Sequence, residues 1–180
     1  MEEYNNTPHG NGDRFNAMFG GEVLLHQQGA SFTFYSTRED GRWMRGDGKG
    51  AGDVNRRARV VLEEMRARAR ALKDQATAAE DERLAKVAAA LSKWANLSDG
   101  SSSAVSMARA ACTDYGHVCD PDETFDTDST LLGTPSSVLE LGEGCVIQRE
   151  IVPADKITFS TAVDWDPGIL HKDREPALVR

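Results

Sequence analysis

Residues 53–73 read DVNRRARVVLEEMRARARALK, and their apolar side chains recur at steps of three and four residues. That spacing is typical of one face of an α-helix that packs against a core. The apolar face comprises Ala58, Val61, Leu62, Met65, Ala69 and Leu72. Because an Asp side chain caps a first helical turn well, the stretch predicts a long helix that begins at Asp53.

The same helical period continues toward the C-terminus as far as Gly116. A second helix is expected from about Glu80, antiparallel to the first, and a third after the break at residues 99–101. The second helix would turn inward Leu84, Val87, Ala88, Leu91 and Ala95. Residues 53–116 are therefore predicted to form a helical bundle.

Residues 13–46 predict a short helix followed by an aromatic β-hairpin. Apolar residues at helical spacing in 13–19 are followed by two glycines, which favour a helix end. The two strands of the hairpin are expected at residues 22–26 and 31–35. Trp43 would lie on a returning strand and pack on the side of Phe32 and Phe34.

Residues 117–165 predict a β-rich region with an antiparallel hairpin. Short β-favouring runs are separated by turn-forming residues, and Gly142-Glu143-Gly144 is the expected hairpin turn. The expected strands lie at residues 131–132, 138–141, 145–147 and 158–163. The predicted fold class is therefore α+β, with a small N-terminal helix and hairpin, a central helical bundle and a C-terminal antiparallel hairpin region.

Residues 13–165 are expected to form one domain with weakly structured ends. Turn formers in residues 1–12 predict a flexible N-terminus, and the four glycines in residues 46–52 predict a hinge. Residues 166–180 are polar with two prolines, which indicates a tail or a truncated linker.

Composition limits the classes of protein that fit. The 180 residues are 39% hydrophobic with a net charge of −8, so most of the chain should fold, and any nucleic-acid contact must come from a local basic patch. No apolar run approaches a membrane span. Three cysteines cannot all pair, and they are widely spaced in a chain without a signal peptide, which favours reduced thiols in a cytosol. A cytoplasmic protein is expected.

One such basic patch follows the predicted first helix. Seven basic residues and only Glu63 and Glu64 as acids lie between Arg56 and Lys73. Helical geometry aligns four of the basic residues in a ridge roughly 20 Å long, namely Arg59, Arg66, Arg70 and Lys73. The ridge could follow a nucleic-acid backbone without reading its sequence. The alternative is a solvated face that pairs with the acidic residues at 80–82.

Two other groups of residues suggest metal ions less specifically. Asp126 and Asp128 resemble the paired carboxylates with which primases hold two metals, and the alternative is a turn whose Asp side chains accept backbone hydrogen bonds. Cys112, His117 and Cys119 offer zinc-type ligands, but without a C-x-x-C pair core cysteines are the simpler interpretation.

The aromatic residues allow two interpretations. Phe32, Phe34 and Trp43 could stack on bases from an exposed sheet, or they could form the small core that holds the hairpin to the helices. The second interpretation is favoured, and Trp94, Phe159 and Trp165 are likewise assigned to packing.

An ordered set of short motifs resembles a known family. Residues 13–15 read DRF, 19–21 FGG, 40–43 DGRW and 91–95 LSKWA. Further on come VCDPD at 118–122, FDTD at 125–128, LL at 131–132, TP at 134–135, VLELG at 138–142, ADKIT at 154–158 and DWDP at 164–167. Together they resemble the N-terminal helicase-associated domain of phage and plasmid DNA primase-helicases and of the poxvirus primase-helicase.

The resemblance implies an accessory domain of DNA replication that couples to a helicase ring or positions DNA, acting in the bacterial host cytosol with a helicase, primase or other replisome protein as partner. It leaves open whether the domain forms oligomers. No G-x-x-x-x-G-K-[ST] phosphate loop occurs in the chain, so no catalytic centre and no cofactor are expected. The alternatives are a stand-alone phage or prophage protein that binds DNA or a replication partner, and a metal-dependent primase that uses Asp126 and Asp128.

Overall fold

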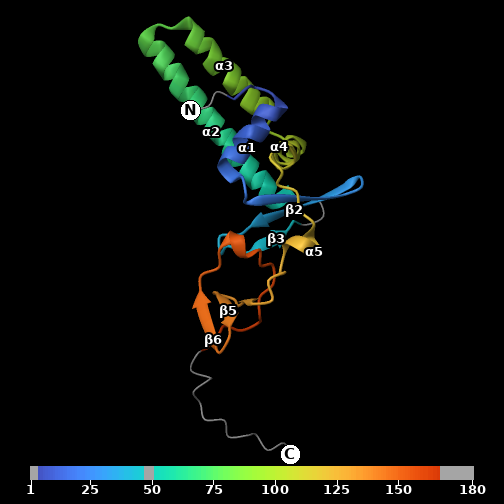
Figure 1. The fold of residues 1–180 in the computed structure, drawn as a ribbon. Coiled ribbons are helices and arrows are strands. Elements are labelled where there is room, and N and C mark those ends of the chain that lie inside the picture. Colours follow the sequence, from blue (N-terminus) through green and yellow to red (C-terminus); the bar gives the residue numbers. More distant parts are fainter. Residues whose placement is uncertain (1–3, 47–50, 167–180) are drawn as a thin grey trace, which may run out of the picture.

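The computed structural model describes residues 4–46 and 51–166, which form an α+β fold in two parts (Figure 1). The larger part combines helices α1–α4 with a three-stranded sheet, and a second three-stranded sheet lies below it. The predicted fold class is thereby confirmed. Within these described ranges, no helix is long and apolar enough to span a membrane.

The central helices form the predicted antiparallel pair. Helix α2 (Ala51–Ala79) is 29 residues long, and α3 (Glu82–Leu97) returns beside it. Asp81 ends the connection and caps α3, because its carboxylate accepts hydrogen bonds from the backbone N–H groups of Arg83 and Leu84 at 2.8 and 3.0 Å. The predicted stripe of α2 is buried as far as Ala69, and Leu72 borders the core. The third helix, α4 (Ser101–Asp114), packs across the base of α2.

Helix α1 (Pro8–Phe19) begins five residues before the predicted start, so the expected flexibility of residues 1–12 is wrong for Pro8–Gly12. Thr7 caps the helix by accepting a hydrogen bond from the N–H of Gly10 at 3.0 Å, and Pro8 suits its first turn. The glycines that suggested a loop instead allow close packing. A Cβ on Gly12 would lie 3.0 Å from that of Ala110 on α4.

The first sheet has the strand order β1-β2-β3, formed by β1 (Val23–Gln28), β2 (Ser31–Thr37) and β3 (Trp43–Arg45). Trp43 lies on the predicted returning strand, but its predicted packing against Phe32 and Phe34 is wrong. It pairs with Thr37, and side chains alternate between faces, so it shares the face of Tyr35. Phe34 faces the helical core, whereas Trp43 packs against Tyr35 and Phe125 on the other side.

The second sheet is formed by β4 (Leu131–Gly133), β5 (Val138–Gly142) and β6 (Cys145–Arg149) in that order. The predicted turn at Gly142-Glu143-Gly144 joins the last two strands, and Gly144 adopts the left-handed φ of 76°. The predicted strand at 158–163 is wrong. That segment is irregular, and its backbone N–H groups form separate hydrogen bonds rather than a strand ladder. Thr158 donates to the carboxylate of Asp126, and Thr161 donates to the carbonyl of Gly133.

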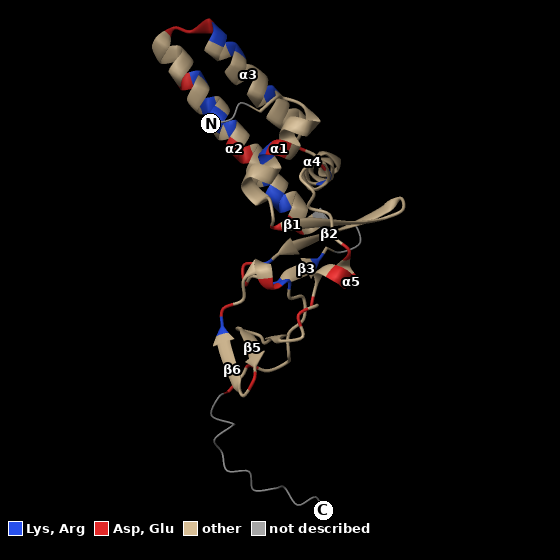
Figure 2. Cartoon of the chain, in the orientation of Figure 1, with Lys and Arg blue, Asp and Glu red and all other residues tan. Residues whose placement is uncertain are grey.

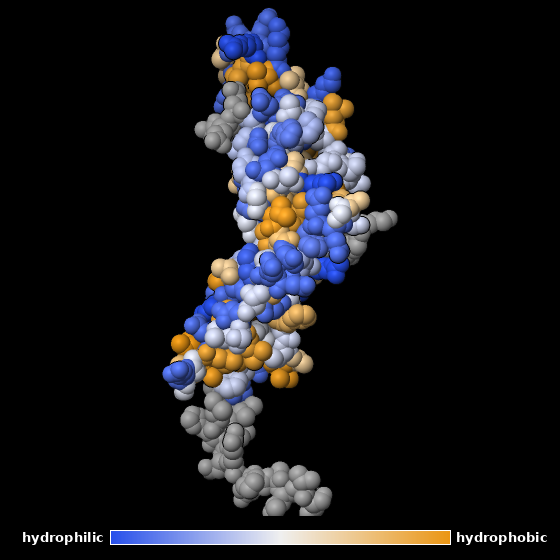
Figure 3. Space-filling view, turned by 45° about the vertical axis from the view of Figure 1, so that its right-hand side comes forward, coloured by the Kyte–Doolittle hydropathy of each residue, from blue (hydrophilic) through white to orange (hydrophobic). Residues whose placement is uncertain are grey.

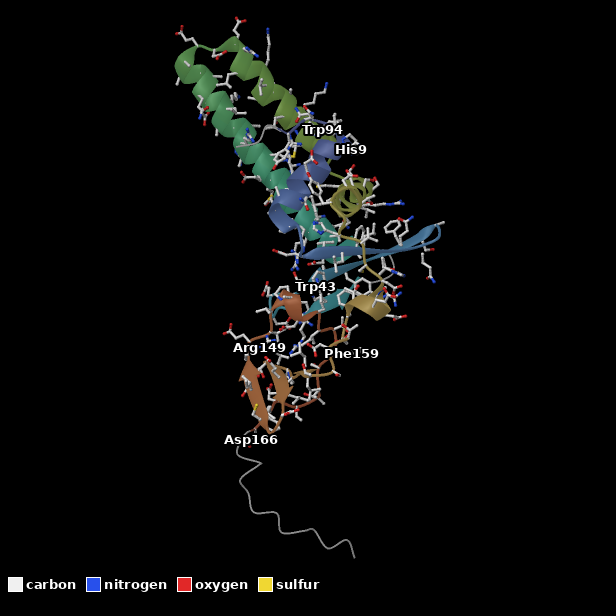
Figure 4. All side chains as sticks on the ribbon, viewed as in Figure 1. His9, Trp43, Trp94, Arg149, Phe159 and Asp166 are labelled. Carbon is white, nitrogen blue, oxygen red and sulfur yellow. The ribbon has the colours of Figure 1, made fainter. Side chains whose placement is uncertain are left out.

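Trp43, labelled in Figure 4, joins the first sheet to the segment that follows β6. Its indole N–H donates to the carbonyl of Pro153 in the short helix η1 (Pro153–Asp155) at 2.7 Å, and its backbone N–H donates to the carbonyl of Ile157 at 2.9 Å. The ammonium group of Lys156 lies 4.0 Å from the centroid of the indole ring. On the other side, the ring of Phe125, just after helix α5 (Pro121–Thr124), lies 5.6 Å away. The indole is thus 1% exposed.

The predicted hinge and tail fall largely outside the described residues. Residues 47–50 of the hinge and 167–180 of the tail are not described, nor are residues 1–3. At the edges of the hinge, Gly46 donates a hydrogen bond to the carbonyl of Phe34, and α2 begins at Ala51 rather than Asp53.

Replacing Trp43 by Ala should destabilise the protein by about 3–5 kcal/mol, because it opens a cavity where the first sheet meets the segment after β6 and leaves the Pro153 carbonyl without its donor. The measurement is urea unfolding followed by circular dichroism. Phe159→Ala is the matched control, since that ring is 76% exposed and its loss should change stability by less than about 0.5 kcal/mol. Equal effects of the two substitutions would show that Trp43 does not hold the junction.

Candidate nucleic-acid interface

The four predicted basic residues lie along one flank of α2, which is called the basic flank below. Their spacing of seven, four and three residues keeps them within one side of the helix, beside the buried stripe. Arg59, Arg70 and Lys73 are exposed, and none of them forms an ion pair with a described carboxylate. Figure 2 shows positive charge recurring along α2 and α3.

Arg66 differs from the other members because the fold supplies it with partners. Its guanidinium donates to the carboxylate of Asp99 at 2.6 Å and to the side-chain oxygen of Asn96 at 3.2 Å. Asn96 lies in the last turn of α3 and Asp99 in the connection to α4, each about thirty residues away in sequence. The predicted alternative, pairing of this flank with residues 80–82, does not occur among the described ion pairs, since Asp81 caps α3 instead.

The basic stretch also contains arginines that serve the fold. The guanidinium of Arg57 is largely buried, and it bonds Asp53 at 3.0 Å, Glu22, and the backbone carbonyl of Thr37 at 2.6 Å. Arg56 pairs with the same Asp53 from the solvent side. The spacing of Asp53 and Arg57, four residues apart on a helix, is the sequence signal that would have identified this pair.

These contacts set the ionisation of Asp53. Burial raises the pKa of its carboxyl group, but hydrogen bonds from Ser36, Arg57 and Arg56 outweigh burial and hold the pKa below its ordinary value. The carboxylate therefore stays charged and anchors the first turns of α2 to the strand end at Thr37. This positions the exposed residues of the basic flank.

Asp128 accepts hydrogen bonds within its own turn, as the simpler interpretation predicts, whereas the carboxylate of Asp126 binds a distant segment. Asp126 has a left-handed φ of 53°, and its carboxylate accepts from the N–H of Thr158 at 2.9 Å and from the same residue's hydroxyl. Asp128 accepts from the N–H and the hydroxyl of Thr130 at 2.9 and 2.6 Å. Within the part of the chain that the structure describes, no three His, Cys, Asp or Glu side chains are grouped to hold a metal ion.

The cysteines and His117 belong to the core and its border. Cys112 lies against the carbonyl of Val23 at 3.6 Å, and burial raises the pKa of its thiol to about 12. Burial likewise raises the pKa of Cys119 to about 11. The imidazole of His117 instead bonds the side chain of Asn16, with 2.8 Å between Nε2 and Oδ1. The three side chains thus have separate structural roles.

The aromatic residues are mostly unavailable to bases. Phe34 and Trp43 are buried in different clusters, and Phe32 lies under the guanidinium of Arg109, 5.2 Å from its ring centroid. Trp94 is partly buried, as expected, and donates its indole N–H to Asn11 at 3.0 Å. The packing predicted for Phe159 is wrong, because its ring is exposed on the smaller sheet region (Figure 4).

Sequence comparison agrees with this architecture. A family model described as D5 N terminal like matches residues 13–175, which is most of the chain. The chain belongs to this family. D5 N terminal like domains are the N-terminal domains of D5-like primase-helicases, so the resemblance inferred from the motifs is confirmed. No curated protein matches the chain closely enough to count as a relative.

The D5 N terminal like match extends across both parts of the fold. It begins within α1, includes the whole of α2 with its basic flank, and continues through the smaller sheet. The α2–α3 pair and the Trp43 junction are thus both parts of the family domain.

Replacing Asp53 by Asn should lower the free energy of unfolding at pH 7 by about 2 kcal/mol, since it leaves Arg57 without one of its two carboxylate partners. A depressed pKa stabilises the fold above the ordinary value of about 3.9, and the benefit is lost as the pH falls through the lower folded pKa. The difference between wild type and variant should therefore shrink below about pH 4 in urea unfolding series.

The exposed Asp74 on the same helix provides the control for this experiment. Asp74→Asn should change stability by less than about 0.5 kcal/mol at either pH. If Asp53→Asn behaved like Asp74→Asn, the Asp53–Arg57 contact would not anchor α2.

Proposed function

We propose that this domain is an accessory module of a DNA primase-helicase that holds nucleic acid along the basic flank of α2. The family match supports the replication context, and the exposure of Arg59, Arg70 and Lys73 supports the contact. The observation that carries the proposal is that these three cations lack a described carboxylate partner in a protein of net charge −8. Such a patch attracts phosphate through counterion release.

The contact is sequence-independent. Arg59 and Lys73 are separated by fourteen residues, which is about 21 Å along a helix and long enough to meet several successive phosphates. As exposed cations on a helix surface, these groups would neutralise the backbone and position the strand. Arg66 contributes less, because Asp99 already neutralises it.

The proposed setting is the replication of a phage or prophage in a bacterial cytosol, with a helicase or primase module as partner. Free cysteines in the described core, Cys112 and Cys119, suit a reducing compartment. The module would couple a helicase ring to DNA through α2, which is tied to the first sheet by the hydrogen bond from Arg57 to the carbonyl of Thr37.

Replacing Arg59, Arg70 and Lys73 together by Gln should flatten the salt dependence of single-strand binding by about two units, because each phosphate contact contributes about 0.7 to the slope. The measurement is fluorescence anisotropy of a labelled oligo-dT at several salt concentrations. Adding Arg66→Gln should change the slope little further, since that guanidinium is paired with Asp99.

Two variants serve as controls. Arg68→Gln lies on the other flank of α2 and should keep the parent's slope. Asp99→Asn releases Arg66 and should steepen the slope by up to about 0.7. A triple Gln variant that folds normally and retains the parent's slope would place any DNA contact elsewhere.

A further inference from the structure

An apolar groove of about 710 Å³ lies on the side of α2 opposite the basic flank. It is bounded by α2, α3, the end of α1 and residues 4–6. The side chains that line its apolar wall from α2 and α3 are Val61, Met65, Leu72, Leu84, Val87 and Leu91. Figure 3 shows hydrophobic surface near the outer end of this helical pair, at the top of the molecule.

The groove exists because two helices alone leave one apolar side uncovered. Helix α1 packs against α2 near its base and brings Ala17 and Met18 to the groove, but no third helix of the described residues lies beside the outer half of the α2–α3 pair. Val87 and Met18 are consequently 43% and 39% exposed. A further helix in this position would complete a three-helix arrangement and cover these side chains.

Guanidinium groups outnumber carboxylates in the lining of the groove. Arg14 is half-buried and donates to neutral oxygens, the carbonyls of Tyr4 and Asn5 and the side chains of Asn6 and Asn11. Burial lowers the pKa of Arg14, and the nearby charge of Arg68 lowers it further, while the carboxylate of Asp13 opposes the shift. Arg14 and Arg68 therefore place two like charges at a site that is partly shielded from water.

Two carboxylates, Glu64 and Asp81, also line the groove and offset part of this charge. Asp81 is engaged in capping α3. Because Arg83 adds a third guanidinium, the lining keeps an excess of one positive charge. The groove thus presents apolar surface with a small excess of positive charge at its border, which is complementary to a helix that carries apolar residues flanked by carboxylates.

We propose that this groove binds an amphipathic, acidic helix of a partner protein. The apolar face of the bound helix covers Leu72, Leu84 and Val87 of the groove. The carboxylates of the bound helix lie beside Arg14 and Arg68. The helix is favoured over an extended segment because the groove runs along two packed helices, whose surface ridges match those of a third helix. DNA on the basic flank and a protein on the groove would occupy opposite sides of the same helix α2.

The test uses the whole protein and two synthetic helical peptides with the same leucine stripe. In one peptide the stripe is flanked by glutamates, and in its twin by lysines. Fluorescence anisotropy should show that the protein binds the glutamate peptide roughly five- to tenfold more tightly than the lysine twin. Because the protein's net charge of −8 favours the lysine twin, this order opposes the effect of bulk charge.

Reversing one charge should reverse the preference. Arg68→Glu should bind the lysine twin more tightly than the glutamate peptide, whereas Arg70→Glu, on the same helix but on the basic flank, should retain the parent's order. Val87→Glu, at an exposed position, should weaken binding of the glutamate peptide without unfolding the protein, which circular dichroism checks.

Three results would overturn the proposal: a parent that prefers the lysine twin, an Arg68→Glu variant with the parent's order, or a Val87→Glu variant that is folded and binds as before. Binding of oleate but of neither peptide would also overturn it and assign the groove to an anionic lipid. The salt slope for oligo-dT is measured on the same variants, and Arg68→Glu should leave it near the parent value. Failure of the peptide-binding proposal and failure of the DNA-binding proposal are therefore distinguishable.

Discussion

The indole of Trp43 is the contact on which the two-part structure depends. The indole N–H and the backbone N–H of Trp43 both bond the segment that follows β6. The ring lies beside Phe125 and Lys156, and its strand pairs with β2. The neighbouring Arg42 reaches the carbonyl of Thr134 from the same strand end. A buried aromatic ring with a satisfied polar group combines packing with a fixed orientation. The smaller sheet is thereby held to the helical part despite having only a small core of its own.

The surface of helix α2 has three sides with different environments. Its stripe packs into the main core, one side presents the basic flank, and the other side borders the apolar groove. This division follows from the helical period, since a stripe of about 100° leaves two separate flanks on either side of it. Arg68 and Arg70 are two residues apart in sequence and lie on different flanks, so the chemistry of α2 depends on the angular position of each arginine rather than on the total charge.

Local patterns in the sequence predicted the helices well, and contacts between distant segments were the main source of error. The period of residues 53–73 identified α2 because periodicity is a local property. The face of Trp43 depends on strand register, which one residue more or less in the turn would reverse. The partner of Arg66 comes from another helix connection, and no neighbouring residue indicates it. The glycines before Asp13 suggested a loop, although the lack of a side chain on Gly12 is what allows α1 to approach α4.

The length of α2 has a mechanical consequence. Its 29 residues correspond to about 43 Å of continuous helix, anchored at one end by the Asp53–Arg57 contact and projecting at the other (Figure 1). Such a rod acts as a lever, and a rotation of about 5° at the anchored end displaces the free end by about 4 Å. Small rearrangements at the first sheet are therefore magnified several-fold at the tip of the α2–α3 pair, and a load applied at the tip is returned to the anchor as torque.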